Sequence, residues 1–337
     1  MVKSVNTLSD IAKLAGVSKS TVSRALNNSS LISKKTREHI QAIAREHNFA
    51  THQVARCLSL KRSHTIGLIV PIHKNKYIND PFLVELLGGI LFGTAEYGYD
   101  LLIGQPQEND PGRVQYYIDS KRADGLILLG CKGYLRTVTD TFQLQYPIIV
   151  WDAAEDLVYC SVNSNNVVGG RLAVAHLLEV GCWQIAFLGG PKDTPEVRLR
   201  YQGYAEMLRE SGRESNPALV VYGDYTSRSG YENMQEILHR VPSVDGVFAC
   251  SDFKAIGAME AIREKGRHVP DEIAVVGFDD VSLAAHCSPP LTTIRQNILQ
   301  AGKTLVRNLM QYLEDNIITK TILPVELVVR KSSDLNA

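Results

Sequence analysis

Apolar residues recur at helical spacing in TLSDIAKLAGVSKSTVSRALN, residues 7–27, and the pattern is broken once, at Gly16-Val17-Ser18. Two short helices that meet at such a break, near a right angle, leave the second helix proud of the surface, where it can enter a DNA major groove. The pattern therefore predicts a helix-turn-helix.

Side chains at the expected helix ends support this interpretation. Thr7 and Asp10 have the spacing of a capping box, so the first helix begins at about Leu8. Ser18 is a suitable N-cap for the second helix, and Ser33 for a third. A small helical bundle without a DNA-binding role is the alternative.

The distribution of charge favours DNA binding over a plain bundle. Up to Arg62 the chain has eleven Lys and Arg against three Asp and Glu, a net charge of +8. The whole chain has 36 basic and 36 acidic residues, so the remainder carries −8. A basic head on an acidic body suits a module that binds a polyanion and that its own body does not attract.

From Thr65 onward, short apolar and β-branched runs alternate with longer amphipathic stretches. The runs are TIGLIV, DLLIG, GLILLG, PIIVW, QIAFLGG, ALVVYG, GVFAC and IAVVGF. Strands that are apolar throughout are buried on both faces, which predicts parallel sheets covered by helices, a doubly wound α/β architecture. Roughly 270 residues is long for one such sheet, so we expect two sheets with a cleft between them. Ligands bind such sheets at the carboxyl ends of the strands.

Polar and aromatic residues just beyond the strands are the candidate ligand contacts. Carboxylates, a guanidinium and aromatic rings in one cleft fit a polyhydroxylated ligand, because hydroxyls need donors and acceptors while sugar ring faces need flat apolar walls. An Asp that follows a strand is a helix cap or turn residue about as often as it is a ligand contact. For the Asp279-Asp280 pair, the alternative role is to anchor a loop. The candidates are Phe82, Trp151, Asp152, Arg200, Ser251, Phe253 and Asp279.

The sequence offers no support for an enzyme, a metal site or a bound cofactor. It lacks the G-x-x-x-x-G-K-[ST], G-x-S-x-G and H-E-x-x-H motifs, and its histidines are scattered. The six cysteines lie far apart with no C-x-x-C pair, so we expect reduced, mostly buried thiols. No apolar run approaches the ~20 residues that span a bilayer, and no secretory signal is evident, so we expect a cytoplasmic protein.

Several segments together resemble the LacI/GalR family of bacterial transcription regulators. The helix-turn-helix segment is followed by SKKTREHIQAIAREHNF and VARCLSL, and then by RLAVAHLLEVGCWQIAFLGGP, FACSDFKAIGAMEAI, VPDEIAVVGFDDV and PPLTTIRQN, in family order. The resemblance covers nearly the whole chain. It implies a helix-turn-helix domain at residues 1–50, a hinge helix at 51–62, and a two-lobed body at 63–337 that resembles periplasmic sugar-binding proteins. The N-lobe would comprise about 63–163 plus 294–323, and the C-lobe about 164–293 plus 324–337.

The resemblance also implies a function. The protein is expected to be a homodimeric repressor of carbohydrate-utilisation genes, with a near-palindromic operator and a small sugar as allosteric effector. Lys19, Ser20 and Arg24 would contact bases, while Ala55 and Leu58 of the hinge would enter the minor groove. The hinge is too short to be a stable helix alone, so we expect it to order on DNA. The implied DNA-binding set is Thr7, Ser18, Lys19, Ser20, Thr21, Ser23, Arg24, Asn27, Ser33, Thr36, His52, Ala55 and Leu58.

Some features leave alternatives open. A sugar that closes the cleft would separate the hinge helices and weaken DNA binding, but some relatives bind DNA better with their effector. The loop from His73 to Asp80, with GDYTSRSGY, resembles a branch that binds cellobiose-type or maltose-type sugars, and a larger or differently gated cleft would explain it equally well.

The chain departs from the family pattern at FATH (49–52), at Asn165-Asn166 and at Gly181-Cys182, which puts the hinge entry and crossover contacts in doubt. No leucine heptad follows LVVRKSSDLNA, so a dimer is expected rather than a coiled-coil tetramer. A transport-type sugar-binding protein and a sugar-modifying enzyme are the rival classes. The former should carry an export signal and no basic head, and the latter a catalytic constellation.

Overall fold

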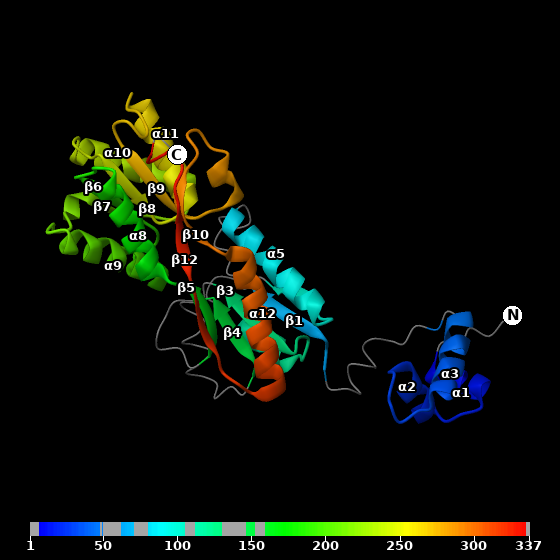
Figure 1. Cartoon of the computed structure of the whole chain (residues 1–337). Helices are drawn as coiled ribbons and strands as arrows, with labels where there is room; N and C mark the ends of the chain where they lie inside the picture. The colour runs from blue at the N-terminus through cyan, green and yellow to red at the C-terminus, as the bar shows by residue number, and fades with distance from the viewer. Residues whose placement is uncertain are drawn as a thin grey trace. The chain divides into compact units, whose positions relative to one another are not determined.

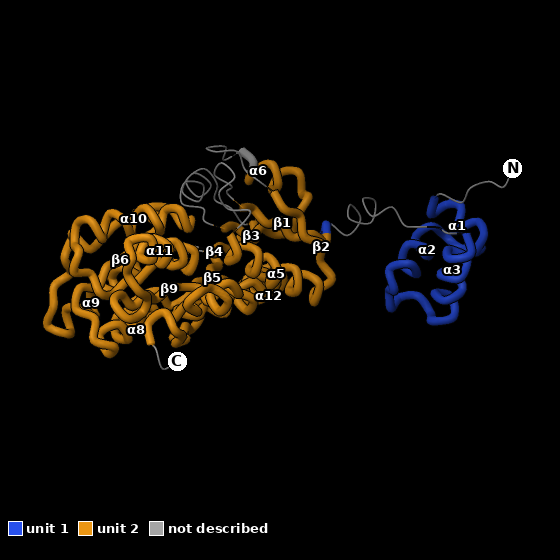
Figure 2. Tube along the Cα trace, turned by 90° about the horizontal axis from the view of Figure 1, so that it is seen from above, with its two compact units in different colours: residues 1–63 blue, residues 64–337 orange. Residues whose placement is uncertain are grey.

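The computed structural model describes residues 7–47, 49, 62–70, 80–104, 112–129, 146–151 and 159–334. The chain forms two compact units, Met1–Ser63 and His64–Ala337 (Figure 2). None of the described helices could span a lipid bilayer.

Unit 1 contains three helices whose first residues follow the capping side chains that the sequence predicts. The Thr7 hydroxyl accepts a bond from the backbone N–H of Asp10, and the Asp10 carboxylate accepts one from the Thr7 N–H, at 3.0 Å. Ser18 and Ser33 cap the next two helices in the same way. The three predicted helix starts are confirmed. The helices are α1 (Leu8–Ala15), α2 (Lys19–Leu26) and α3 (Lys34–Glu46).

The turn between α1 and α2 depends on Gly16. Its φ of 64° lies in the left-handed region, which glycine adopts without the steric penalty of a side chain. The turn allows the two helices to pack on α3 around a small core in which Ile11, Val22, Ala25 and Ile40 are fully buried. These side chains fix which face of α2 is left for solvent.

The described part of unit 2 contains two sheets, as the sequence predicts, and each has six strands (Figure 1). The first has the strand order β11-β5-β4-β3-β1-β2, and every pairing in it is parallel. Its strands are β1 (Thr65–Ile69), β2 (Asp100–Gly104), β3 (Gly125–Leu129), β4 (Ile148–Trp151), β5 (Cys160–Ser164) and β11 (Lys320–Leu323). The helices α5 (Pro81–Glu96), α6 (Gly112–Asp119) and α12 (Ile298–Asp315) belong to this half.

The second sheet has the order β12-β10-β9-β8-β6-β7 and differs from the expected parallel pattern at one edge. There β12 runs antiparallel to β10, while the other pairings are parallel. Its strands are β6 (Ile185–Gly189), β7 (Val220–Tyr222), β8 (Gly246–Ala249), β9 (Ala274–Asp279), β10 (Thr292–Gln296) and β12 (Val325–Val328). Its helices are α8 (Asn166–Glu179), α9 (Pro195–Glu210), α10 (Ser227–Arg240) and α11 (Asp252–Glu264), with 3₁₀ turns at Pro217–Leu219 and Ser282–Ala285.

The chain crosses between the two halves through single residues. Asn165 joins β5 to α8, Asn297 joins β10 to α12, and Pro324 joins β11 to β12. Both asparagines cap the helix that follows, and their backbone torsions are nearly identical, with φ of −73° and −75° and ψ of 79° in each. The first and second crossovers thus bracket all of the second half except β12 and the residues after it, and all three crossovers are short.

Four cysteines of the described residues are free thiols. Cys160, Cys182 and Cys250 are buried and Cys287 is half-buried. Reduced, mostly buried thiols were the expectation for these positions. Cys57 and Cys131 lie outside the described residues.

Three helix pairs in unit 2 cross at glycines. A Cβ on Gly89 of α5 would lie 2.2 Å from the Leu299 carbonyl oxygen of α12. A Cβ on Gly203 of α9 would lie 2.2 Å from the Val167 oxygen of α8, and Gly257 of α11 meets α10 in the same manner. Backbone therefore contacts backbone at these crossings, so a side chain there would have to push two helices apart.

We expect Gly89→Ala to lower the free energy of unfolding by about 1 to 3 kcal/mol, since the added methyl overpacks the α5–α12 contact. Gly88→Ala is the matched control, because a Cβ there would meet only Leu299 Cδ1 at 3.8 Å. That change should stabilise the helix by up to about 1 kcal/mol. Urea unfolding can be followed by tryptophan fluorescence, as both tryptophans lie in unit 2. Equal midpoints for the two variants would contradict the close crossing.

Candidate functional sites

The face of α2 opposite its core contacts carries exposed polar side chains. Val22 and Ala25 are buried against α1 and α3, while Lys19, Ser20 and Arg24 are exposed. These three are the residues expected to contact bases, and nothing in unit 1 covers them among the described residues. Thr21, Ser23 and Asn27 are half-buried beside them.

Other residues of the predicted DNA-binding set serve as helix caps. Ser18 Oγ lies 2.8 Å from Ser20 Oγ and 2.9 Å from Thr21 Oγ1, and Ser33 Oγ lies 2.8 Å from Thr36 Oγ1. Caps and DNA contacts are compatible, because a hydroxyl has one donor and two acceptor positions. His52, Ala55 and Leu58 lie outside the described residues, as does most of the expected hinge.

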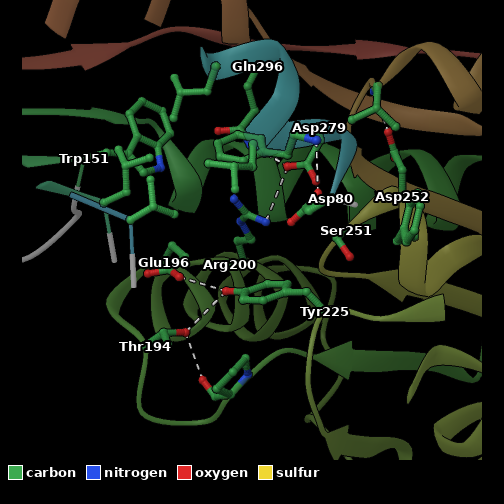
Figure 3. A pocket seen from close by; sticks show the side chains of 18 residues that line it. Asp80, Trp151, Thr194, Glu196, Arg200, Tyr225, Ser251, Asp252, Asp279 and Gln296 are labelled. Carbon is green, nitrogen blue, oxygen red and sulfur yellow. Dashed lines mark hydrogen bonds and ion pairs between the residues drawn. The ribbon is translucent and has the colours of Figure 1, made fainter. Parts of the chain in front are cut away.

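Unit 2 contains a cavity of about 380 Å³, within the ~300 to 1,000 Å³ range of small-molecule sites (Figure 3). It lies at the carboxyl ends of strands from both sheets, where the sequence places a ligand. The first half contributes mainly apolar side chains and the second mainly polar ones. The lining residues are Val70, Asp80, Phe82, Leu83, Leu86, Leu129, Trp151, Pro191, Thr194, Glu196, Arg200, Tyr225, Ser251, Asp252, Phe253, Asp279, Val281 and Gln296.

Arg200 of α9 is buried and joins four elements. Its Nε donates to Asn166 Oδ1 of α8 at 2.8 Å, and its Nη1 donates to the Cys250 carbonyl oxygen at the end of β8. The guanidinium carbon lies 3.6 Å from the centroid of the Phe278 ring, and Nη1 lies 3.9 Å from Asp279 Oδ1 of β9. Arg200 is therefore both a lining residue and a brace for the polar wall.

The sequence left two interpretations for the Asp279-Asp280 pair, a ligand contact and a loop anchor. In the structure Asp279 has the position of the first and Asp280 has the role of the second. Asp279 lines the cavity and accepts a bond from Gln296 Nε2 at 2.5 Å. Asp280 accepts bonds of 2.6 Å from Arg295 Nε and from Arg330 Nη2, which anchor the loop.

Both aspartates have positive φ, 115° and 59°, which is uncommon outside glycine and is typical of strained functional sites. Burial raises the pKa of Asp279 well above its ordinary value, although the charge of Arg200 acts in the opposite direction.

Ser251 and Asp252 begin α11 at the end of β8. Ser251 Oγ caps the helix by accepting a bond from Lys254 N at 3.3 Å. Asp252 is fully buried, and its oxygens accept bonds from Thr293 Oγ1 at 2.5 Å and from Val281 N at 2.9 Å. Burial raises the pKa of Asp252 to about 7. The carboxyl of Asp252 thus joins β10 to the loop after β9, while Ser251 is a helix cap at the pocket surface.

Two aromatic groups complete the pocket. Phe82 and Trp151 pack at 5.7 Å between ring centroids, with their planes tilted by 46°, and form an aromatic wall in the first half. In the second half, Tyr225 OH donates to Glu196 Oε1 at 2.8 Å and lies 3.4 Å from Thr194 Oγ1. Burial raises the pKa of Tyr225 well above its ordinary value, which keeps its hydroxyl a donor.

Six of the seven predicted ligand contacts line the cavity: Phe82, Trp151, Arg200, Ser251, Phe253 and Asp279. Asp152 lies outside the described residues. Six polar lining residues are not among the seven candidates. These are Asp80, Thr194, Glu196, Tyr225, Asp252 and Gln296. Asp80-Pro81 and Thr194-Pro195 each mark the start of a helix, and this is the signal by which the sequence could have pointed to Thr194 and Glu196.

Comparisons with known proteins bear on both units. The family model for bacterial regulatory proteins of the lacI family matches residues 7–52 of the sequence. A second family model, for a periplasmic binding protein-like domain, matches residues 174–333. The chain is 34% identical to the HTH-type transcriptional regulator CelR of Thermobifida fusca, over 96% of this chain and 95% of CelR.

Two solved structures resemble the whole chain. The complex of the transcriptional regulator CelR with cellobiose has a TM-score of 0.75 and 31% identity, covering 97% of this chain and 99% of that one. The Lac repressor dimer bound to operator and the anti-inducer ONPF has a TM-score of 0.85 and 29% identity, covering 97% and 98%.

Proposed function

Because the chain belongs to the LacI family of bacterial regulatory proteins, we propose that it represses carbohydrate-utilisation genes and that a sugar in the unit 2 pocket controls its affinity for operator DNA. The protein is a DNA-binding transcription regulator, and members of its family are regulators rather than enzymes. Acting on operators, it works in the cytoplasm. Membership of this family argues against the two rival classes, a sugar-modifying enzyme and a transport-type sugar-binding protein.

The exposed face of α2 reads the operator. Arg24 can donate two parallel bonds to the O6 and N7 of one guanine, while Lys19 and Ser20 meet neighbouring bases. Thr21, Ser23 and Asn27 flank this face and hold phosphates, which fix the register of the helix. The excess of Lys and Arg in the head supplies the attraction that does not depend on sequence.

The two-sided pocket is the observation that carries the sugar proposal. Phe82 and Trp151 offer flat apolar surfaces to ring C–H groups, and the opposite wall offers Arg200, Ser251 and Asp279 to hydroxyls. The solved relative CelR binds cellobiose, and 31% identity over nearly both full lengths supports a gluco-oligosaccharide here.

An apolar surface on the first half supports a homodimer. Val84, Leu91 and Phe92 of α5 are 57%, 49% and 59% exposed, and Ile103 of β2 is 53% exposed. Val84 and Leu91 lie seven residues apart, on one face of α5, and exposed large apolar side chains on one face are typical of an interface. A two-fold dimer places two α2 helices on DNA, so the operator is a near-palindrome.

The test is a binding assay with the purified full chain. A palindromic duplex selected from a random pool should bind in preference to the same duplex with scrambled half-sites. Cellobiose or a maltose-type sugar should then weaken operator binding by about 5-fold to 150-fold, the usual range of allosteric coupling. Enhanced binding would reverse the sign and make the sugar a corepressor. No preference for any palindrome, with or without sugars, would overturn the proposal.

A further inference from the structure

We propose that Lys254 is a positioning residue for effector binding: its buried ammonium holds the turn of residues 223–226, and the turn keeps Tyr225 in its place in the pocket wall. Tyr225 lines the pocket and Lys254 does not, so Lys254 acts on a ligand through Tyr225. This inference rests on the proposed sugar-binding function and adds to it a residue that lies behind the wall.

Lys254 lies in the first turn of α11 and is fully buried. Its Nζ donates to the Asp224 carbonyl oxygen at 2.9 Å, to Ser229 Oγ at 3.0 Å and to Asn233 Oδ1 at 2.7 Å. These three bonds use every donor of an ammonium group. One side chain therefore joins α11 to the first two turns of α10 and to the turn that precedes α10.

The ammonium occupies an electrostatically unfavourable place. Among the described residues its acceptors are all uncharged oxygens, and the Asp224 carboxylate accepts instead from Thr226 N and Thr226 Oγ1. The group also lies by the N-terminal turns of α10 and α11, where the helix dipoles disfavour a cation. Burial lowers the pKa of Lys254, although the charge of Asp224 acts in the opposite direction. An apolar side chain would fill this space at less cost, so stability alone does not explain the lysine.

The turn that Lys254 holds is tightly packed. A Cβ on Gly223 would meet Ser229 Oγ and would lie 3.4 Å from Lys254 Nζ. Ser229 Oγ also accepts a bond from Asp224 N, at 3.1 Å. Asp224 is thus fixed through its N–H and through its carbonyl group, and the carbonyl group is held by Lys254. The next residue in the chain is Tyr225.

Tyr225 spans the space between two loops, so its position depends on this turn. A Cβ on Gly190, in the loop after β6, would lie 2.7 Å from Tyr225 Cε1. The Tyr225 hydroxyl donates to Glu196 Oε1 in the first turn of α9, and the close view shows the two side chains joined in the pocket wall (Figure 3). Binding groups must be held within about 0.5 Å of their productive positions. A shift of the Asp224 carbonyl would move the hydroxyl and release Glu196.

The first experiment is calorimetry of the full chain with cellobiose and maltose. Lys254→Met removes the charge and the three donors but keeps a long side chain. It should weaken the sugar that the wild type binds by ~10-fold, while operator affinity without sugar stays within about twofold. An unchanged dissociation constant overturns the inference but leaves sugar control intact. If the wild type binds neither sugar, the proposed sugar function fails, and the inference fails with it.

Met259→Ala is the matched control for lost stability. Met259 is buried on the same helix, in the core of the second half, and its contacts do not include the turn. This variant should melt at a lower temperature, yet its dissociation constant for sugar should stay within about twofold of the wild type. Equal losses of sugar affinity in Met259→Ala and Lys254→Met would make Lys254 a packing residue only.

The second experiment is a double-mutant cycle with Tyr225→Phe, which removes the hydroxyl alone. We expect Tyr225→Phe to weaken sugar binding by ~10-fold. Adding Lys254→Met to it should weaken binding by no more than about twofold further, because the hydroxyl that Lys254 positions is already absent. Losses that multiply to ~100-fold would show that the two residues act independently, and would refute the positioning role.

Ser229→Ala tests the same link if Lys254→Met does not fold. Alanine suits the helix, and the change removes the oxygen that both Asp224 N and Lys254 Nζ bind. This variant should weaken sugar binding by ~3-fold or more, and the loss should disappear in the Tyr225→Phe background. A loss that persists in that background would contradict the inference.

Discussion

Arg24→Ala is expected to weaken operator binding by roughly 30-fold to 20,000-fold. A bidentate arginine–guanine contact is worth about 1 to 3 kcal/mol of discrimination, and a two-fold dimer makes it twice, which gives about 2 to 6 kcal/mol. Arg24 is exposed on the last turn of α2, away from the core formed by Val22 and Ala25. The change should therefore leave the head folded. Fluorescence anisotropy with the selected palindrome at physiological salt measures the loss.

Arg24→Lys is the control that separates base reading from charge. Lysine keeps the positive charge but cannot form two parallel bonds to one base edge. This variant should keep nearly wild-type affinity for random DNA while its preference for the palindrome falls. If Arg24→Ala weakens random and palindromic duplexes by the same factor, the residue holds phosphate and the recognition assignment is wrong.

Arg200→Ala is expected to lower the free energy of unfolding of unit 2 by about 3 to 5 kcal/mol and to remove the response to sugar. Deleting one partner of a buried ion pair leaves the other charge unpaired, and here two further acceptors, on Asn166 and Cys250, lose their donor. The ring of Phe278 also loses its stacked guanidinium. Thermal and urea unfolding measure the first effect, and the operator assay with sugar measures the second.

Arg198 provides a matched control on the same helix. It is exposed, two residues before Arg200, and its replacement by alanine should change stability by no more than about 0.5 kcal/mol. The sugar response should be unaltered. Similar losses for both variants would show that α9 is sensitive to any change, and that the buried contacts of Arg200 are not special.

The helices of the head and the apolar strands could be predicted from the sequence because their signals are local. A capping hydroxyl and the amide it binds lie three residues apart, as at Thr7 and Ser18. Strands such as β3 and β6 are buried along their whole length, and their residues are accordingly apolar throughout. Such patterns need no knowledge of the tertiary partners.

The sequence did not predict four of the strands, because their polar side chains form hydrogen bonds with residues that are distant in the sequence. β5 reads CSVNS and β10 reads TTIRQ, neither of which forms an apolar run, and β11 and β12 are short and alternating. Thr292 is fully buried in β10, and its hydroxyl donates to the Arg330 carbonyl oxygen at 2.7 Å, 38 residues away. The pairing that makes a polar segment a buried strand is visible only in the fold.

The pocket was predicted in part for a similar reason. Residues just after parallel strands converge because the carboxyl ends of neighbouring strands meet, which placed Ser251 and Asp279 correctly in the lining. Asp80 and Glu196 come from helix starts and Tyr225 from the short loop between β7 and α10, and the positions of these segments depend on packing. The inward bonds of Arg200 join residues 34 and 50 positions apart, so its role as a brace could not be read from the spacing.

The single-residue crossovers at Asn165, Asn297 and Pro324 set how the two halves of unit 2 can move. With so few free torsions at these three crossovers, any relative movement of the two halves would be a rigid-body rotation about them, and its displacement would grow with distance from them. Asn166 follows the first crossover residue directly and holds Arg200 at 2.8 Å, so a ligand that shifts this guanidinium pulls on the crossover itself. A small shift of Arg200 at the ligand would thereby produce a larger displacement at the ends of the two halves that lie farthest from the crossovers.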